Sequence, residues 1–502
     1  MKEVLAELRT HLAQVRDLAQ ASSVLGWDRE TNMPPGGAAA RARQLGTLST
    51  MAHRLFVSDQ VGEWLEQLVP YEAELGFASD EGSLIRVTRR EYQKQRRVPS
   101  ELVGQMARAA SLGHQAWVRA RQESDFGLFQ PNLEELVALR LQWARCFDYE
   151  ESLYDPMLDN FEPGLTAAQV RRVFDEYRPA LVRLVSAISD PAVQQRVDTG
   201  CLQGDFDPAA QWELGLEALR TIGFDFNRGR QDRSAHPFTT SFSCDDVRIT
   251  TRFDPGNLAS GLFSSIHEGG HALYELGVSP TLDDTLLGNG ASMVAHESQS
   301  RLFENVIGRS RPFWRFFYPA LQARFPQFKS VDLETFYRAI NRVTPSLIRV
   351  EADEVTYGLH IVLRFELEQA LVDGTLVVAD LPEAWNAKME AYLGIRPPND
   401  ALGVLQDVHW SGGMMGYFPE YLLGSMLSVQ LYNQARQEIP DLESQIETGR
   451  LDGLVAWLRE KIHRHGSKFT LGELTDQVLG TPLSPQPYLA YLHERYGEIY
   501  RL

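Results

Sequence analysis

Cysteine is scarce in this sequence, and long apolar runs are absent. The 502 residues include only Cys146, Cys201 and Cys244, an odd number without a Cys-x-x-Cys spacing. We therefore expect reduced thiols and a cytoplasmic location. No apolar run reaches the roughly 18 residues of a membrane helix, and the charged helix expected at residues 1–20 lacks the apolar segment of a signal peptide. The sequence predicts no membrane span.

Positive charge is also in short supply. Lys and Arg number 49 against 67 Asp and Glu, which gives a net charge of −18. Such a chain would repel phosphates, so a nucleic-acid partner is not expected. The chain also lacks a Ser/Gly-rich or Pro-rich linker, and its 43% hydrophobic content can fill a large core. We therefore predict a single domain over residues 1–502.

The first half of the sequence has mainly helical periodicity. Up to about residue 225, apolar residues recur every three or four positions, with breaks at Pro, Gly or Asp/Ser. Asn132 follows Pro131 and is expected to cap a helix, while Trp27–Gly36 is expected to interrupt the first helices with a turn. The helices predicted in this part span residues 1–20, 37–66, 80–96, 99–124, 132–155, 165–188 and 207–222.

One stretch, residues 264–276, has the pattern of a metal site. It places His267 and His271 four positions apart, with Glu268 between them. On a helix such histidines share one face one turn apart, so both imidazoles can bind one metal ion while the glutamate lies beside them. A helix with no metal is the alternative interpretation.

The same stretch is typical of a helix. Its apolar residues follow helical spacing, and Gly277 is expected to end it. Gly269 and Gly270 each cost roughly 1 kcal/mol in helix propensity. Glycine at such positions indicates that another backbone approaches closely there.

A catalytic zinc site needs a third protein ligand and an open position. The metzincin pattern is excluded, because this chain has Tyr274 and Gly277 where that pattern requires Gly and His. A carboxylate from a second helix, expected at residues 288–308, is the remaining common solution, and Glu297 is the preferred candidate. Competing carboxylates are Glu275, Asp283, Asp284 and Glu304.

This set of residues predicts a hydrolytic mechanism. A metal ion held there would polarise a carbonyl and acidify water, and Glu268 would take the proton and deliver it to the leaving amine. The oxyanion needs a neutral or cationic donor. The stretch 394–419 is expected to be a binding loop, a structural aromatic loop being the alternative. Spacing does not choose among the available donors, which are His409, Tyr417 and Tyr421.

The sequence period changes between residues 233 and 253. Apolar residues alternate with polar ones there, which predicts short strands; the apolar residues are Phe238, Phe242, Val247 and Ile249. In one interpretation these strands form a sheet edge at which an extended peptide pairs by backbone hydrogen bonds, along Asp246–Thr250. In the other they form a hairpin that only packs on helices.

Five short strings together resemble the carboxypeptidase Taq family of thermostable metallocarboxypeptidases. They occur in the family's order, and Trp27–Gly36 resembles its N-terminal signature, so the resemblance covers nearly the whole chain. The matching strings are His236–Phe238, Asp246–Thr250, His267–His271, His296–Gln299 and Gly403–Trp410.

The resemblance implies a mainly α fold. It would be a large, all-helical, saddle-like homodimer with a deep substrate groove and a small β-sheet beside the metal helix, similar to neurolysin and angiotensin-converting enzyme. The single catalytic domain, residues 1–502, would have a helical N-terminal part at 1–225. The metal site and groove would lie in 226–502.

The resemblance also implies a cofactor, a substrate and site residues. His267, His271 and Glu297 would bind the metal, and Glu268 would be the general base. Zinc is the usual metal, with cobalt or manganese sometimes effective. The substrates would be peptides with a free C-terminus, which lose one residue at a time. The oxyanion donors favoured are His409 and Tyr421, followed by Tyr417.

An exopeptidase must also bind the terminal carboxylate of its substrate. Arginine suits this task, because it can donate two parallel hydrogen bonds to a carboxylate. Arg349 resembles the family's carboxylate-binding arginine, and a helix-surface ion pair with Asp353 is the alternative. Arg248 is the second candidate, and His236 is grouped with them in substrate binding.

Two other functions are considered. An endo-oligopeptidase of the related deep-groove class would still cleave a peptide with an amidated C-terminus, which a carboxypeptidase would not. A catalytically silent peptide-binding scaffold would bind no metal. That third hypothesis fails if Glu268→Gln abolishes hydrolysis while metal content and folding stay unchanged.

Overall fold

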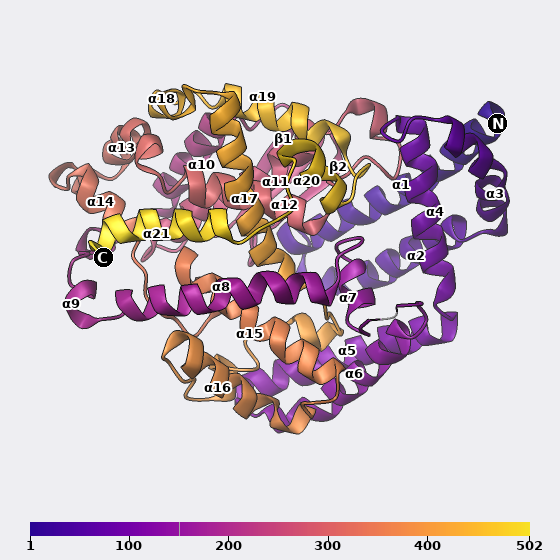
Figure 1. Cartoon of the computed structure of the whole chain (residues 1–502), viewed down its shortest axis with the longest axis horizontal. Coiled ribbons are helices and arrows are strands. Elements are labelled where there is room, and N and C mark those ends of the chain that lie inside the picture. Colours follow the sequence, from indigo (N-terminus) through magenta and orange to yellow (C-terminus); the bar gives the residue numbers. More distant parts are fainter. Residues whose placement is uncertain (150) are drawn as a thin grey trace. The chain divides into compact units, whose positions relative to one another are not determined.

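The computed structural model describes residues 1–149 and 151–502, and it consists mainly of helices with one small sheet (Figure 1). This confirms the predicted mainly α fold class. The helices before the sheet are α1 (Lys2–Thr31), α2 (Ala38–Phe56), α3 (Asp59–Glu74), α4 (Asp80–Arg97), α5 (Ser100–Glu123), α6 (Gln130–Ala144), α7 (Asp155–Asp159), α8 (Ala167–Ile188), α9 (Pro191–Gln194) and α10 (Pro208–Ile222).

The chain after the sheet is again helical. None of the helices in the described residues combines the length and the apolarity needed to cross a bilayer. These later helices are α11 (Leu258–Gly277), α12 (Met293–Arg301), α13 (Arg311–Arg324), α14 (Leu333–Ile340), α15 (Glu354–Val372), α16 (Leu381–Leu393), α17 (Phe418–Glu438), α18 (Leu442–Glu447), α19 (Asp452–Lys461), α20 (Leu471–Leu479) and α21 (Gln486–Tyr500).

The structure confirms four of the early helices and extends the first. The helices predicted at 80–96, 99–124, 165–188 and 207–222 correspond to α4, α5, α8 and α10. The first helix continues beyond residue 20 to Thr31, so the predicted turn is confined to the residues that follow. Pro34 and Pro35 follow after two residues, and the residue before a proline, here Met33, is disfavoured in the helical conformation.

Two other predicted helices need correction. The helix predicted at 37–66 is divided into α2 and α3 at Ser58, whose extended backbone interrupts the helical hydrogen bonds. The helix predicted at 132–155 corresponds to α6, which ends well before residue 155. Asn132 does not cap α6, because Pro131 already occupies the first turn and places Asn132 inside the helix.

The chain forms two compact units, and each is assembled from three separate segments. Unit 1 comprises Met1–Arg96, Gly200–Ile340 and Gln430–Pro482. Unit 2 comprises Arg97–Thr199, Asn341–Val429 and Leu483–Leu502.

The core of unit 1 joins segments that are distant in sequence. Leu5, Leu8 and Leu12 of α1 belong to the same buried cluster as Val278 and Leu287, which follow α11. Burying one such side chain stabilises a fold by roughly 1.5–3 kcal/mol. The N-terminal helices are therefore held by residues that come directly after the predicted metal motif.

The sheet belongs to unit 1 and contains three strands in the described residues. They are β1 (Gly229–Arg233), β2 (Thr239–Ser243) and β3 (Asp246–Thr251), in the order β1-β3-β2. β3 pairs in parallel with β1 and antiparallel with β2. The predicted change to strands is confirmed, although β1 begins before residue 233.

The predicted pairing of a substrate along Asp246–Thr250 is wrong. These residues form β3, the central strand, whose backbone groups on both sides already bond to β1 and β2. The strand that lies at the edge of the sheet and also packs on α11 is β2.

Candidate metal centre

The two histidines of the motif lie on α11. Asn257 caps this helix, since its side chain accepts a hydrogen bond from the Ser260 backbone N–H at 3.1 Å. The helix ends at Gly277 as predicted. His267 and His271 lie one turn apart, and their ring centroids are 5.0 Å apart.

The two glycines of the motif allow neighbouring helices to approach α11. A Cβ on Gly269 would lie 2.7 Å from the Leu219 side chain of α10. A Cβ on Gly270 would lie 2.6 Å from the backbone oxygen of Gln299 and 2.7 Å from the Cα of Ser300, both on α12. The predicted close backbone approach is confirmed at Gly270, where it brings α12 beside the histidines, whereas the neighbours of Gly269 are side chains of α10.

Glu297 comes from α12 and lies between the two histidines. Its Oε2 is 3.6 Å from His267 Nε2 and 3.3 Å from His271 Nε2. One ligand atom from each of the three residues can be chosen so that all lie within 4.8 Å of one another. Among the described residues, this is the single group of three or more His, Cys, Asp or Glu side chains so arranged.

Glu297 is buried and held in its anionic form. Arg301 Nε donates to its Oε1 at 2.7 Å, and the Ser300 hydroxyl donates to its Oε2 at 2.9 Å. Burial alone would raise the pKa of Glu297, but Arg301 and His267 hold that pKa well below its usual range. The carboxylate is therefore ionised and can serve as an anionic ligand.

His267 is oriented by a second carboxylate. Its Nδ1 lies 2.8 Å from Oε2 of Glu304, which belongs to the π-helix η5 (Leu302–Ile307) that continues α12. The helix predicted at 288–308 is thus formed by α12 and η5. With Nδ1 engaged by Glu304, Nε2 is the nitrogen of His267 that faces Glu297. Two imidazole nitrogens and one carboxylate oxygen are a donor set typical of catalytic zinc, so these residues fit the implied metal.

Two of the four competing carboxylates lie near the candidate ligands, and the other two have partners elsewhere. Glu304 contacts His267, and Glu275 lies two hydrogen bonds from His271, through the ring of His296. These two carboxylates therefore lie next to the candidate ligands but are not part of the group that could hold a metal ion. Asp283 accepts a hydrogen bond from the Cys244 backbone N–H, and Asp284 pairs with Arg9.

Glu268 lies beside the histidines and contacts the sheet. The Thr239 hydroxyl of β2 donates to Glu268 Oε2 at 2.6 Å. Burial raises the pKa of Glu268, although His267 and the Thr239 hydrogen bond oppose that effect. A carboxylate with a raised pKa binds a proton more readily, which suits a general base.

In unit 2, Arg349 belongs to a buried group of charges. Arg349 and Arg364 both pair with Asp407, at 2.8 Å and 2.5 Å. Tyr357 also accepts from Arg349 at 3.2 Å. The alternative pairing of Arg349 with Asp353 is wrong, because Asp353 caps α15 with its side chain instead.

The predicted oxyanion donors lie together around Arg349. His409 stacks on Tyr417, with ring centroids 5.5 Å apart, and Tyr417 meets Tyr421 edge-on at 5.2 Å. The Arg349 guanidinium lies 5.0 Å from the Tyr421 ring centroid. Burial lowers the pKa of His409 to about 4, so its imidazole is neutral at pH 7. The stretch 394–419 thus contributes His409 and Tyr417 to a cluster that also contains Arg349 and Tyr421.

Arg248 and His236 lie elsewhere in unit 1. Arg248 donates two hydrogen bonds to the carboxylate of Asp246, each at 2.9 Å, and its guanidinium lies 4.4 Å from the Trp27 ring centroid. Its carboxylate-binding face is therefore occupied. His236 is exposed, and its backbone oxygen accepts from the Ser234 hydroxyl. A substrate contact for either residue stays a prediction.

Three residues that contact candidate site residues were not predicted from the sequence, namely Arg301, Thr239 and Arg364. Arg301 could have been found, since it lies four residues after Glu297 on one helix and such pairs interact. Thr239 and Arg364 carry no comparable signal, because each acts on a residue that only folding brings near.

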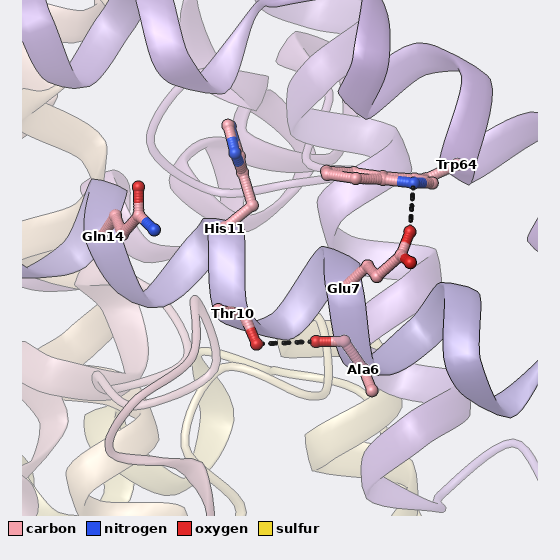
Figure 2. Close-up of a pocket in the computed structure, with 6 residues that line it drawn as sticks. All are labelled: Ala6, Glu7, Thr10, His11, Gln14 and Trp64. Atoms are coloured by element: carbon pink, nitrogen blue, oxygen red, sulfur yellow. Dashed lines mark hydrogen bonds between the residues drawn. The ribbon is translucent and has the colours of Figure 1, made fainter.

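A hollow on the surface of unit 1 lies between α1 and α3 and is separate from these residues. Figure 2 shows Trp64 of α3 reaching over α1, where its indole N–H donates to Glu7 at 3.2 Å. The His11 ring meets the Trp64 ring edge-on, and His11 Nε2 contacts the Leu55 backbone oxygen. The polar groups of this hollow are thus largely engaged with one another.

Comparison with known proteins gives a consistent result. Residues 7–496 match the family described as carboxypeptidase Taq (M32) metallopeptidase. Carboxypeptidase 1 of Bacillus subtilis is 38% identical over 98% of this chain and 97% of its own, and thermostable carboxypeptidase 1 of Thermus thermophilus is 39% identical over 96% of each. The crystal structure of an M32 carboxypeptidase from Deinococcus radiodurans is 39% identical, has a TM-score of 0.96 and covers 100% of both chains.

Proposed function

Because this chain belongs to the carboxypeptidase Taq (M32) metallopeptidase family, we propose that it releases amino acids one at a time from the free C-terminus of peptides. The observation that carries this proposal is the convergence of His267, His271 and Glu297 beside the buried Glu268. It supplies the ligands and the base that hydrolysis of a peptide bond requires.

The metal in this proposal is zinc. Two imidazoles and one carboxylate would hold it and leave room for water and substrate. When bound, the ion supplies Lewis acidity that polarises the scissile carbonyl and acidifies water. Arg301 and Glu304 contribute by fixing the charge of Glu297 and the orientation of His267.

Glu268 is the general base of the proposed reaction. Thr239 holds one of its oxygens, which leaves the other to accept a proton from water. Burial strengthens the base by raising its pKa. Glu268 then delivers the proton to the amine that leaves, so a single side chain serves both halves of the reaction.

Arg349 binds the terminal carboxylate of the peptide in this proposal. Arg349 and Arg364 are both buried, yet their ion pairs share the one carboxylate of Asp407. Two cations paired with one anion retain a positive charge, and that charge favours an anionic ligand. Asp407 and Arg364 would hold the Arg349 guanidinium in place.

The oxyanion is stabilised by donors from the cluster around Arg349. His409 is neutral at pH 7 and can donate one N–H. Tyr421 and Tyr417 offer phenolic hydroxyls beside it. Among variants at His409, Tyr421 and Tyr417, the one that lacks the main donor would lose the most kcat. Such a donor acts mainly in the transition state.

Digestion of paired peptides tests the proposal. One peptide has a free C-terminus, its partner has the same sequence with a C-terminal amide, and mass spectrometry follows both with and without a chelator. Stepwise loss from the free peptide alone, abolished by chelation and restored by zinc, is the expected result. Internal cleavage of both peptides would instead identify an endopeptidase, and undiminished cleavage in chelator would remove the metal from the mechanism.

The proposed cellular form is a cytoplasmic homodimer. Cys146, Cys201 and Cys244 form no disulfide among the described residues, which supports a reducing compartment. Light scattering after size-exclusion chromatography should give twice the 56.7 kDa mass of the chain. A mass of one chain would contradict the dimer.

A further inference from the structure

We propose that His296 and Glu275 position His271 by fixing the proton on its Nδ1, so that Nε2 is always the atom presented to the metal. The inference rests on the metal site of the proposed function and adds a named role for two residues outside it. His296 and Glu275 are positioning residues, because they act through His271.

The contacts form a chain of three side chains from two helices of unit 1, α11 and α12. His271 Nδ1 of α11 lies 2.7 Å from His296 Nδ1 of α12. His296 Nε2 lies 2.7 Å from Glu275 Oε1, one turn further along α11. Glu275 Oε1 also accepts a hydrogen bond from the Gly290 backbone N–H at 3.0 Å.

The order of protons along this chain follows from Glu275. Glu275 Oε1 accepts the Gly290 N–H and also lies against His296 Nε2, so Glu275 forms the accepting end of the chain. His296 must then donate from Nε2. With Nε2 of His296 turned to Glu275, its Nδ1 is the nitrogen that faces His271, and in the proposed order it accepts the Nδ1 proton of His271. The lone pair of His271 is left on Nε2, which lies 3.3 Å from Glu297 Oε2.

The ring of His296 is held in place by packing. Tyr274 lies against it with centroids 5.1 Å apart, and the Tyr274 hydroxyl accepts from the Ala291 backbone N–H. Gly290 also packs closely against the His296 ring, since a Cβ at that position would lie 2.7 Å from His296 Cδ2. The ring therefore has little freedom to turn away from His271.

The two candidate histidine ligands are supported unequally. His267 bonds directly to the Glu304 carboxylate, whereas His271 reaches Glu275 only through the ring of His296. A carboxylate in direct contact makes an imidazole a stronger donor to a metal than a neutral acceptor does. The chain His271–His296–Glu275, called the relay below, thus orients His271. The larger increase in basicity is that of His267.

Zinc affinity of the apoprotein tests the relay. His296→Phe keeps a ring against Tyr274 but cannot accept or donate, whereas in His296→Gln the amide oxygen can accept from His271 and the amide nitrogen can donate to Glu275. Competition with a chromophoric chelator should show affinity about 10- to 100-fold weaker for His296→Phe. His296→Gln should restore most of that loss, and the thermal midpoint of each apoprotein reports on folding.

Two results would overturn the relay: unchanged affinity in His296→Phe, or an equal loss in His296→Gln, which would make the role one of packing. Failure of the metal site itself looks different, since the wild type would then bind no zinc or His271→Ala would bind it as tightly. Proton NMR of the cobalt-loaded wild type gives a check that needs no variant. His271 should show a hyperfine-shifted Nδ1 proton that disappears in D2O, and absence of that signal contradicts the relay.

Discussion

Glu268, Glu297 and Glu304 are all buried around the metal centre, and their neighbours give them different affinities for a proton. Burial acts on each in the same direction, but Arg301 lowers the pKa of Glu297 well below its usual range and that of Glu304 to about 2. For Glu268, burial outweighs the opposing effects of His267 and the Thr239 hydrogen bond, so its pKa stays raised. The residue that binds a proton most readily is therefore the one proposed as the general base.

Glu268→Gln tests this assignment. The substitution keeps the size of the side chain and a hydrogen-bond acceptor for Thr239, but it removes the base. We expect kcat to fall by about 10²- to 10⁴-fold, with zinc content and thermal midpoint unchanged. Assays on the free peptide and metal analysis of the same sample provide the measurement. Near-normal kcat in a metal-loaded variant would assign the base to another residue.

A buried carboxylate in unit 2 makes stability depend on pH. Glu368 accepts hydrogen bonds from the Tyr154 hydroxyl, the Trp410 indole and the Gly416 N–H. Burial nevertheless raises its pKa from 4.5 to about 6. Between these values the folded chain holds a proton that the unfolded chain has released, so stability falls as pH rises through this window.

Comparison of the wild type with Glu368→Gln isolates that contribution. Between pH 4.5 and pH 7, the wild type should lose roughly 2 kcal/mol of unfolding free energy that the variant does not lose. Urea unfolding at a series of pH values measures the difference between the two proteins. A difference that stays constant with pH would show that Glu368 titrates normally in the folded state.

At the scale of elements, the packing of α12 on α11 brings together the three residues of the candidate metal centre. Gly270 allows the contact, because the α12 backbone occupies the space that a side chain would need. Glu297 lies on the same short helix as the contacting residues Gln299 and Ser300. Any displacement of α12 at Gly270 therefore moves Glu297 relative to the two histidines.

Gly270→Ala should disturb both stability and metal binding. The added Cβ meets backbone atoms, which cannot rotate away, so we expect a cost of about 1–3 kcal/mol and weaker zinc binding. Gly104→Ala on α5 is the matched control, since a Cβ there meets nothing within 4 Å and the change should stabilise by about 0.5–1 kcal/mol. Thermal melts and chelator competition compare the two variants. Equal zinc affinity in Gly270→Ala and wild type would contradict the role of this contact.

Long helices and the metal motif could be predicted from the sequence because their signals are local. The period of apolar residues identified α5 and α8, and the spacing of His267 and His271 needs only one helix. The π-helix at η5 and the central position of β3 depend on long-range packing. The same holds for the relay through His296, since His271 and His296 share no helix.

At the scale of the whole molecule, chain order and spatial organisation differ. The sequence favoured a division near residue 225, with a helical part before it and the site after it. The structure instead builds each unit from three segments, and residue 225 lies inside the second segment of unit 1. Unit 1 needs the N-terminal helices to cover Val278 and Leu287, and unit 2 needs α8 against α15.

Neither part of the chain should therefore fold alone. A fragment of residues 1–225 would expose the α1 leucines that Val278 and Leu287 bury in the intact chain, and each exposed side chain loses roughly 1.5–3 kcal/mol. We expect no cooperative melting transition for this fragment or for 226–502 by circular dichroism. Co-expressed, the two should associate, bind zinc and cleave the free peptide, with the intact chain as control. A cooperative transition in the isolated 1–225 fragment would contradict this interleaved assembly and the single catalytic domain predicted over residues 1–502.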